Sequence, residues 1–136
     1  AVGTRAWDAL GDRMHALRTH PGLTTAGKVR GGLLALVDIG RLQPHLFKLM
    51  FSNPPGDPTA LARAAERSQT EFLAVVADLV GEPDARRYAA LLISSASGIA
   101  GLEASGQLSD PKWGGVSAEE LTDTLVDLVA GKGRRA

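Results

Sequence analysis

Apolar residues recur at intervals of three and four along almost the whole chain, the spacing that places side chains on one face of an α-helix. The first run carries Trp7, Leu10 and Met14 in this way. No window alternates apolar and polar residues over the length of a strand. The sequence therefore predicts an all-α fold, a helical bundle of about five long helices plus one short one.

Prolines and glycines divide this helical pattern into segments. Proline has no amide hydrogen for a helix interior, and glycine favours the left-handed turn that ends many helices. The helices expected between these residues cover approximately 7–20, 24–42, 45–51, 58–80, 83–108 and 117–130. Asp57, directly before Pro58, is an expected N-cap. Ser117 and Glu120, three positions apart, are expected to form a capping box at the last helix.

Composition limits both the size and the class of the protein. The 136 residues, 44% of them apolar, are enough for one hydrophobic core, so residues 1–136 are expected to form a single domain. Fifteen basic residues balance fifteen acidic ones, which leaves no overall positive charge to attract nucleic acid. The lack of cysteine excludes disulfides and thiolate metal sites. The longest uncharged run, 88–102, is shorter than the ~20 apolar residues that span a bilayer, so no membrane contact is expected.

No arrangement of residues predicts catalysis, a metal or a cofactor. The glycine spacing in 101–106 is that of a phosphate-binding loop, but the lysine and hydroxyl residue that should follow are missing. His15 and His20 do not share a helical face, so we interpret them as surface residues. Asp38 and Arg41, three positions apart, are expected to form a surface ion pair. We therefore expect a protein that is not an enzyme and holds no cofactor and no metal.

The expected helix 83–108 is apolar or small nearly all round, which an ordinary surface helix is not. Small residues at spacings of three and four let another helix approach closely. The last expected helix also has apolar residues on more than one face. Either the two helices form a subunit interface, or both lie inside the core of one chain. The residues expected at the dimer interface are Ser94, Gly98, Gly101, Ser105, Leu121, Leu125 and Leu128.

The segment 43–51 places Phe47, Met50 and Phe51 in one short turn. Methionine and phenylalanine side chains can line an adaptable apolar cavity. They can equally fill one end of a hydrophobic core. The residues alone leave both interpretations open.

A family resemblance rests on the order of the helices and on two stretches, QPHLFKLMF at 43–51 and ASGIAGLEASG at 96–106. The whole chain resembles the C-terminal domain of tetracycline-repressor (TetR) family regulators. It is most similar to the WHG-type branch, named for a tryptophan and a histidine-glycine pair in the penultimate long helix. In this chain Ile93 stands about where the tryptophan would be, and Ser97 replaces the histidine before Gly98.

The resemblance implies the effector-sensing and dimerisation domain of a bacterial, cytoplasmic transcriptional repressor. Its homodimer would be built from the last two helices, and a small hydrophobic effector would bind among the middle helices and shift the two DNA-reading heads. Residues 1–20 do not match the family's helix-turn-helix, so operator DNA would be contacted only through an N-terminal domain absent from this chain. The alternative is a structural helical dimerisation module without a ligand.

Within the implied fold, we expect the effector pocket between helices 24–42, 58–80 and 83–108, with the turn at 43–51 closing one end. No charged residue lies clearly on an inward stripe of these helices. The expected ligand is therefore uncharged and hydrophobic. The residues expected to line the pocket are Leu33, Val37, Phe47, Met50, Phe51, Ser68, Phe72, Val76, Leu92 and Ser95.

Overall fold

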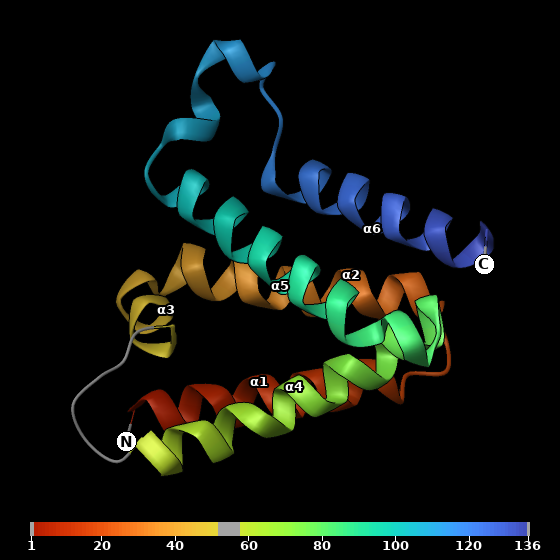
Figure 1. The fold of residues 1–136 in the computed structure, drawn as a ribbon. Helices are drawn as coiled ribbons and strands as arrows, with labels where there is room; N and C mark the ends of the chain where they lie inside the picture. The colour runs from red at the N-terminus through yellow and green to blue at the C-terminus, as the bar shows by residue number, and fades with distance from the viewer. Residues whose placement is uncertain (1, 52–57, 136) are drawn as a thin grey trace.

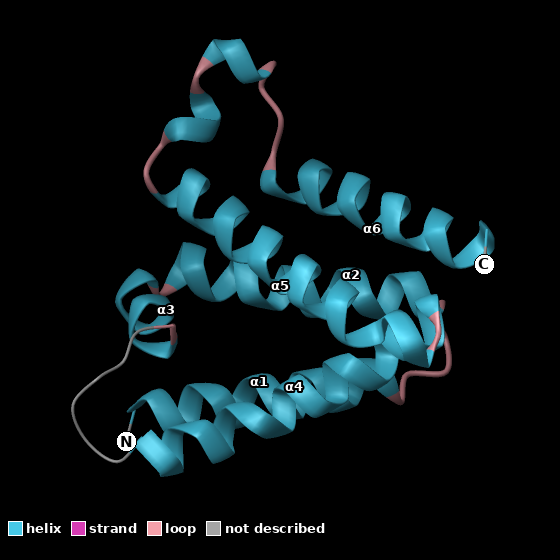
Figure 2. Ribbon diagram, in the orientation of Figure 1, coloured by secondary structure: helices cyan, strands magenta, loops and turns pink. Residues whose placement is uncertain are grey.

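Six α-helices and two short 3-10 turns make up residues 2–51 and 58–135, the part of the chain that this computed structural model describes (Figures 1 and 2). The α-helices are α1 (Val2–Arg18), α2 (Thr25–Leu42), α3 (Pro44–Met50), α4 (Pro58–Val80), α5 (Glu82–Ala104) and α6 (Ala118–Arg135). The 3-10 turns, η1 (Gln107–Ser109) and η2 (Pro111–Trp113), lie between α5 and α6. Over these ranges there is no strand, and the predicted all-α fold with five long helices and one short one is confirmed.

The helix ends follow local sequence signals. Thr24 caps α2 by accepting a hydrogen bond from the amide of Gly27 at 3.0 Å. At the start of α6 the amide of Glu120 donates to Ser117 Oγ at 3.0 Å, and the amide of Ser117 donates to Glu120 Oε1 at 3.2 Å. This reciprocal pair confirms the predicted capping box. Gly81, with φ of 94°, separates α4 from α5.

Three predicted helix bounds were wrong. The helix α1 begins at Val2, five residues before its predicted start. The helix α5 ends at Ala104, four residues early, because Gly106 adopts φ of 78° and turns the chain out of the helix. The helix α6 continues to Arg135, past its predicted end, because a glycine inside a helix weakens it without removing a backbone hydrogen bond. The predicted cap Asp57 lies outside the described residues.

The helices α1 and α4 lie against each other and form one side of the molecule, at the bottom of Figure 1. The helix α2 contacts α1, α4, α5 and α6. On the other side α6 packs on α5 and α2, while the short α3 contacts α1 and α2 at one end. The helix α2 is therefore the central element of the bundle.

The core forms where the helical spacing predicts it. On α1, Trp7, Leu10 and Met14 are each less than a tenth exposed. Burying a large apolar side chain of this kind contributes ~1.5–3 kcal/mol to folding. The largest side chains with almost no exposure come from α2, α4, α5 and α6, and they are Val29, Leu33, Val37, Val76, Leu92 and Thr122.

Two glycines of α2 allow neighbouring helices to approach closely. A Cβ atom added at Gly32 would lie 3.0 Å from Met14 Sδ and 3.2 Å from a ring carbon of Phe72. At Gly40 an added Cβ would lie 3.0 Å from the Cβ of Ala100 in α5. The packing of α2 against α1, α4 and α5 therefore depends on the absence of side chains at these positions.

Candidate functional site

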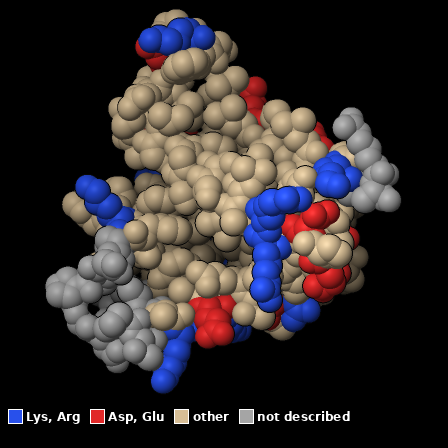
Figure 3. Space-filling view, viewed as in Figure 1, with Lys and Arg blue, Asp and Glu red and all other residues tan. Residues whose placement is uncertain are grey.

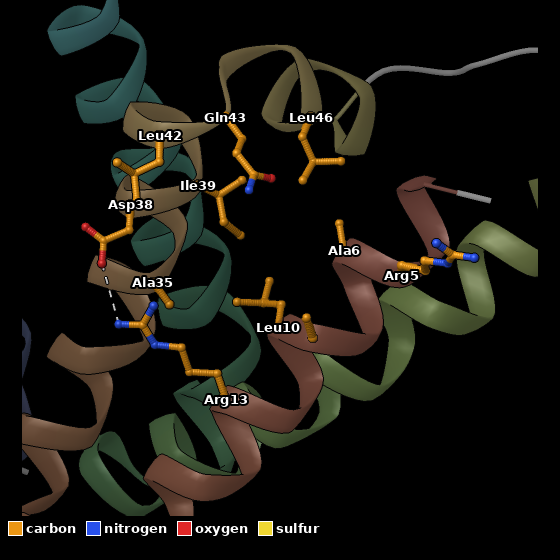
Figure 4. Close-up of a pocket in the computed structure, with 11 residues that line it drawn as sticks. Arg5, Ala6, Leu10, Arg13, Ala35, Asp38, Ile39, Leu42, Gln43 and Leu46 are labelled. Atoms are coloured by element: carbon orange, nitrogen blue, oxygen red, sulfur yellow. Dashed lines mark ion pairs between the residues drawn. The ribbon is translucent and has the colours of Figure 1, made fainter.

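A cavity of about 420 Å³ lies between α1, α2 and α3, and Figure 4 shows the side chains around it. Its apolar walls come from all three helices. Its polar groups come from α1, from α2 and from Gln43, which directly follows α2. The apolar lining residues are Ala6, Ala9, Leu10, Ala35, Ile39, Leu42 and Leu46. The polar lining residues are Arg5, Arg13, Asp38 and Gln43.

Small side chains keep this cavity open. Ala6 and Ala9 line it from α1 and Ala35 lines it from α2, and three methyl groups cannot fill the space between the two helices. Pro44 starts the short helix α3, which places Leu46 over one end of the cavity. Mostly apolar walls with a few polar groups are features that small-molecule sites commonly have.

An ion pair joins α1 and α2 at the edge of the cavity. Arg13 Nη2 lies 3.5 Å from Asp38 Oδ2, and the dashed line in Figure 4 marks this contact. Asp38 Oδ1 also lies 3.8 Å from Arg41 Nη1, which confirms the predicted ion pair. The side chains of Arg13 and Asp38 are 50% and 37% exposed, so water weakens the attraction between them.

Arg41 extends these ion pairs to α5 and α6. Its guanidinium donates hydrogen bonds to both carboxylate oxygens of Glu103 at 2.8 Å and to Glu119 Oε1 at 2.8 Å. The bond to Glu103, followed by the bond to Glu119, raises the pKa of Arg41 further above its ordinary value. The same contact with Arg41 lowers the pKa of Glu119. A continuous set of ionic contacts thus runs from Arg13 at the cavity to the two last helices.

A second, smaller cavity of about 40 Å³ lies beside the first, and Leu10 lines both. Trp7 also lines it, and the buried indole Nε1 of Trp7 has no hydrogen-bond partner in the described part of the chain. Ser68, another lining residue, donates to the carbonyl of Ala65 at 2.9 Å. This volume is sufficient for a water molecule and too small for an organic ligand.

The ten residues predicted to line a pocket divide into three groups. Phe51, Ser68 and Phe72 line the smaller cavity. Four others, Leu33, Val37, Val76 and Leu92, are fully buried in the core, and Met50 is 4% exposed. Phe47 and Ser95 are half-buried, and the Phe47 ring lies 4.9 Å from that of Phe51. None of the ten lines the larger cavity.

The larger cavity lies elsewhere because α2, α4 and α5 pack directly on one another, so that their bulky inward side chains fill the space between them. The space that stays open is against α1, which the sequence analysis treated only as part of the core. The facing alanines were the available signal, since alanine is an apolar residue too small to fill a gap between helices. No sequence feature indicated that Arg13 belongs to this site, because its partner Asp38 lies 25 positions further along the chain, on another helix.

The residues predicted at a dimer interface lie mostly at the surface of this single chain. Ser94, Gly98 and Gly101 of α5 are exposed, as is Ser105 directly after it, and a Cβ added at either glycine would meet no atom of another element within 4 Å in the described part of the chain. On α6, Leu128 is 70% exposed, whereas Leu121 and Leu125 are half-buried. Leu91 and Leu102, which the prediction did not include, are 49% and 42% exposed on α5. Figure 3 shows that the surface over the C-terminal half of α5 is largely free of charged side chains.

Among residues 2–51 and 58–135, no three histidine, aspartate or glutamate side chains gather in a way that could hold a metal ion. In the same ranges no helix is long and apolar enough to cross a membrane. Comparison with known proteins gave no match to a curated protein or to a solved structure. Comparison with protein families matched residues 29–129 to the tetracycline repressor-like C-terminal domain. That match covers most of the chain, and the protein therefore belongs to the family of tetracycline repressor-like C-terminal domains.

Proposed function

We propose that this chain is the effector-binding and dimerisation domain of a transcriptional repressor that responds to a small, mostly apolar ligand. The observation that carries the proposal is the cavity of about 420 Å³, which falls within the ~300–1,000 Å³ of typical small-molecule sites. Membership of the family supports it, since such domains belong to regulators. Within the family, the small-residue stretch 96–106 keeps the WHG-type branch as our working assignment.

The position of the cavity suggests how a ligand would act. A molecule bound between α1 and α2 would favour one separation of these helices over others, and such a preference is what couples two sites in a protein. We place the DNA-reading helix-turn-helix before residue 1, joined through α1. A shift of α1 would then reach the DNA-reading domain directly, in a regulator acting in the bacterial cytoplasm.

We also propose that the chain forms a homodimer through α5 and α6. The support is the exposure of Leu91, Leu102 and Leu128 on these two helices, together with the open space around Gly98 and Gly101. Large apolar side chains gain free energy when a partner removes them from water. The cavity has no lining residue on α5 or α6, so a partner on that face would leave it accessible.

The competing function is a structural dimerisation module without a ligand. It is favoured by the close packing of α2, α4 and α5, where Leu33, Val76 and Leu92 have no exposed surface. The two functions differ in one testable respect, which is whether the cavity beside α1 takes up a small molecule.

The test is a thermal-shift screen of this chain against small hydrophobic molecules, neutral and charged. A ligand that binds the folded state at 100 times its dissociation constant stabilises it by about 2.7 kcal/mol, which raises the melting temperature measurably. The variant Ala9→Trp adds a large side chain at an exposed position of α1 that lines the cavity. Ala16→Trp makes the same change at an exposed position of α1 outside it, and serves as the matched control.

We expect ligands that stabilise the unmodified chain and Ala16→Trp equally, and that no longer stabilise Ala9→Trp. Binding that survives in Ala9→Trp would show that the ligand site lies elsewhere. If no compound shifts the melting temperature of the unmodified chain, the structural module replaces the sensor as the better account.

A further inference from the structure

The charges around the larger cavity do not balance. Among the described residues that line it, Arg5 and Arg13 face one acidic residue, Asp38. Asp38 has a second cationic neighbour in Arg41, whose Nη1 lies 3.8 Å away. The charge of Arg41 is already offset by Glu103 and Glu119, so the excess comes from the lining itself, where Arg5 and Arg13 outnumber Asp38 by one positive charge, although the chain as a whole has no net charge.

Arg13 has unused hydrogen-bonding capacity. A guanidinium carries five N–H donors, and its best partner is a carboxylate that accepts two parallel hydrogen bonds at ~2.7–2.9 Å. The contact between Arg13 and Asp38 is longer, at 3.5 Å, and within the described residues Arg13 donates no hydrogen bond. Exposed ion pairs of this kind are weak, so a better-placed carboxylate can displace Asp38.

The apolar part of the cavity extends from Arg13 along α1 toward its N-terminal end. With a rise of 1.5 Å per residue, the wall from Ala6 to Arg13 is about 10 Å long. Ile39 and Leu46 face this wall from α2 and α3 (Figure 4). The space suits an alkyl chain of medium length better than a compact polar molecule.

We infer that the ligand is an amphipathic carboxylate, an inference that rests on the proposed ligand-binding function. Its carboxylate binds the Arg13 guanidinium in place of Asp38, and its alkyl part lies between α1 and α2 against Ala6, Ala9 and Ile39. This differs from the uncharged ligand that the sequence predicts, because α1 brings an arginine to the cavity. Among the described lining residues, an ammonium ligand would face two arginines and one carboxylate, Asp38, which already pairs with Arg13 and Arg41.

Displacement of Asp38 has a consequence beyond the cavity. Asp38 keeps Arg41 as its remaining cationic partner, and Arg41 is bonded to Glu103 of α5 and Glu119 of α6. A carboxylate ligand thereby changes the ionic contacts of the residue that ties α2 to the proposed dimerisation helices. An uncharged apolar ligand has no such route.

Isothermal titration calorimetry of this chain tests the inference with three probes of one chain length: octanoate, 1-octanol and octylammonium, at the same ionic strength and below micelle-forming concentrations. We expect octanoate to bind at least about tenfold more tightly than 1-octanol, because a charge-assisted pair forms with Arg13. Octylammonium should bind most weakly. Ala9→Trp should abolish the binding of octanoate, which excludes non-specific uptake on other surfaces.

Substitutions at the head-group site sharpen the test. Arg13→Gln should remove the preference for octanoate and leave the affinity for 1-octanol unchanged. Arg13→Lys should retain only part of the preference for octanoate, because lysine keeps the positive charge but lacks the planar guanidinium that binds both carboxylate oxygens. Asp38→Asn should tighten octanoate binding, since it removes the competing carboxylate. The control is Arg67→Gln, which removes an arginine paired with Asp12 between α4 and α1 at 2.6 Å, away from the cavity.

The inference is overturned if octanoate binds no more tightly than 1-octanol, if its preference survives Arg13→Gln, or if octylammonium binds most tightly. It is also overturned if no probe binds while the screened compounds lose their effect in Ala9→Trp. In that case the cavity is still a ligand site, and the proposed function stands. If neither the probes nor the screened compounds bind, the proposed function fails as well.

Discussion

Glu71 shows how one carboxylate on α4 joins that helix to α1. It accepts hydrogen bonds from Arg18 and from His15, whose Nδ1 lies 3.0 Å from Glu71 Oε1. The hydrogen bond from Arg18 is the main reason that the pKa of Glu71 is below its ordinary value. A carboxyl with a lowered pKa in the folded state stabilises the fold fully above its unfolded pKa, and loses that contribution as the pH falls through the folded value.

We therefore predict that Glu71→Gln lowers the free energy of unfolding at pH 7 by about 1 kcal/mol, because Arg18 would then donate to an uncharged amide oxygen in place of a carboxylate. The variant should also lose less stability than the unmodified chain when the pH falls below about 4.5, the ordinary range of glutamate. Urea unfolding at several pH values measures both effects. Glu66→Gln, at an exposed position of the same helix, is the control. Parallel pH profiles for Glu71→Gln and the unmodified chain would contradict the assignment.

At the scale of single residues, the sequence predicts contacts between residues that are close along the chain. It misses contacts between residues that are far apart in the sequence. Asp38 and Arg41 are neighbours on one helical face, so their pairing could be predicted. The partners of Arg41 in α5 and α6 lie 62 and 78 positions away, and no spacing rule relates them. Only the fold brings Arg13 to the same aspartate.

At the scale of helices, the approach of α5 to α2 depends on Gly40. An added Cβ would lie 3.0 Å from Ala100 Cβ and 3.4 Å from the Phe47 ring. We predict that Gly40→Ala lowers the free energy of unfolding by about 1–2 kcal/mol, since overpacking at a helix contact outweighs the higher helix propensity of alanine. Urea denaturation measures the change.

The matched control is Gly11→Ala in α1, where the added Cβ would meet only the flexible side chain of Arg67 at 3.4 Å. There the helix propensity of alanine should prevail, with a gain of up to about 1 kcal/mol. Equal effects of the two substitutions would mean that the contact between α2 and α5 is looser than the structure has it.

The helices themselves could be predicted because each depends on its own sequence, as the capping box at Ser117 does. The position of the cavity could not, because it depends on how the helices pack. Large inward side chains such as Leu33 and Leu92 were predicted to line a pocket, yet they are fully buried in the core. The cavity is lined instead by alanines of α1 and α2, whose small size matters only once the two helices face each other.

For the whole molecule, the account proposes two functional faces. The cavity lies among α1, α2 and α3, and the exposed apolar side chains of α5 and α6 lie on a surface that contributes nothing to it. A second copy bound to α5 and α6 would bury this surface and leave both cavities free for ligand. The proposed regulator requires dimerisation, and in the single chain the apolar side chains that would form the dimer interface are exposed to water.

Static light scattering at micromolar concentration tests most directly whether the chain forms a dimer through α5 and α6. It is applied to the unmodified chain, to Gly101→Leu and to a control, Ala74→Leu, which adds a leucine at an exposed site on α4. A Cβ added at position 101 meets no atom of another element within 4 Å in the described part of the chain, so Gly101→Leu should fold normally and still disturb close approach by a partner helix. The account predicts twice the mass of one chain for the unmodified protein and for Ala74→Leu, and a shift toward the monomer for Gly101→Leu. A monomeric unmodified chain, or a Gly101→Leu dimer as stable as the unmodified one, would contradict it.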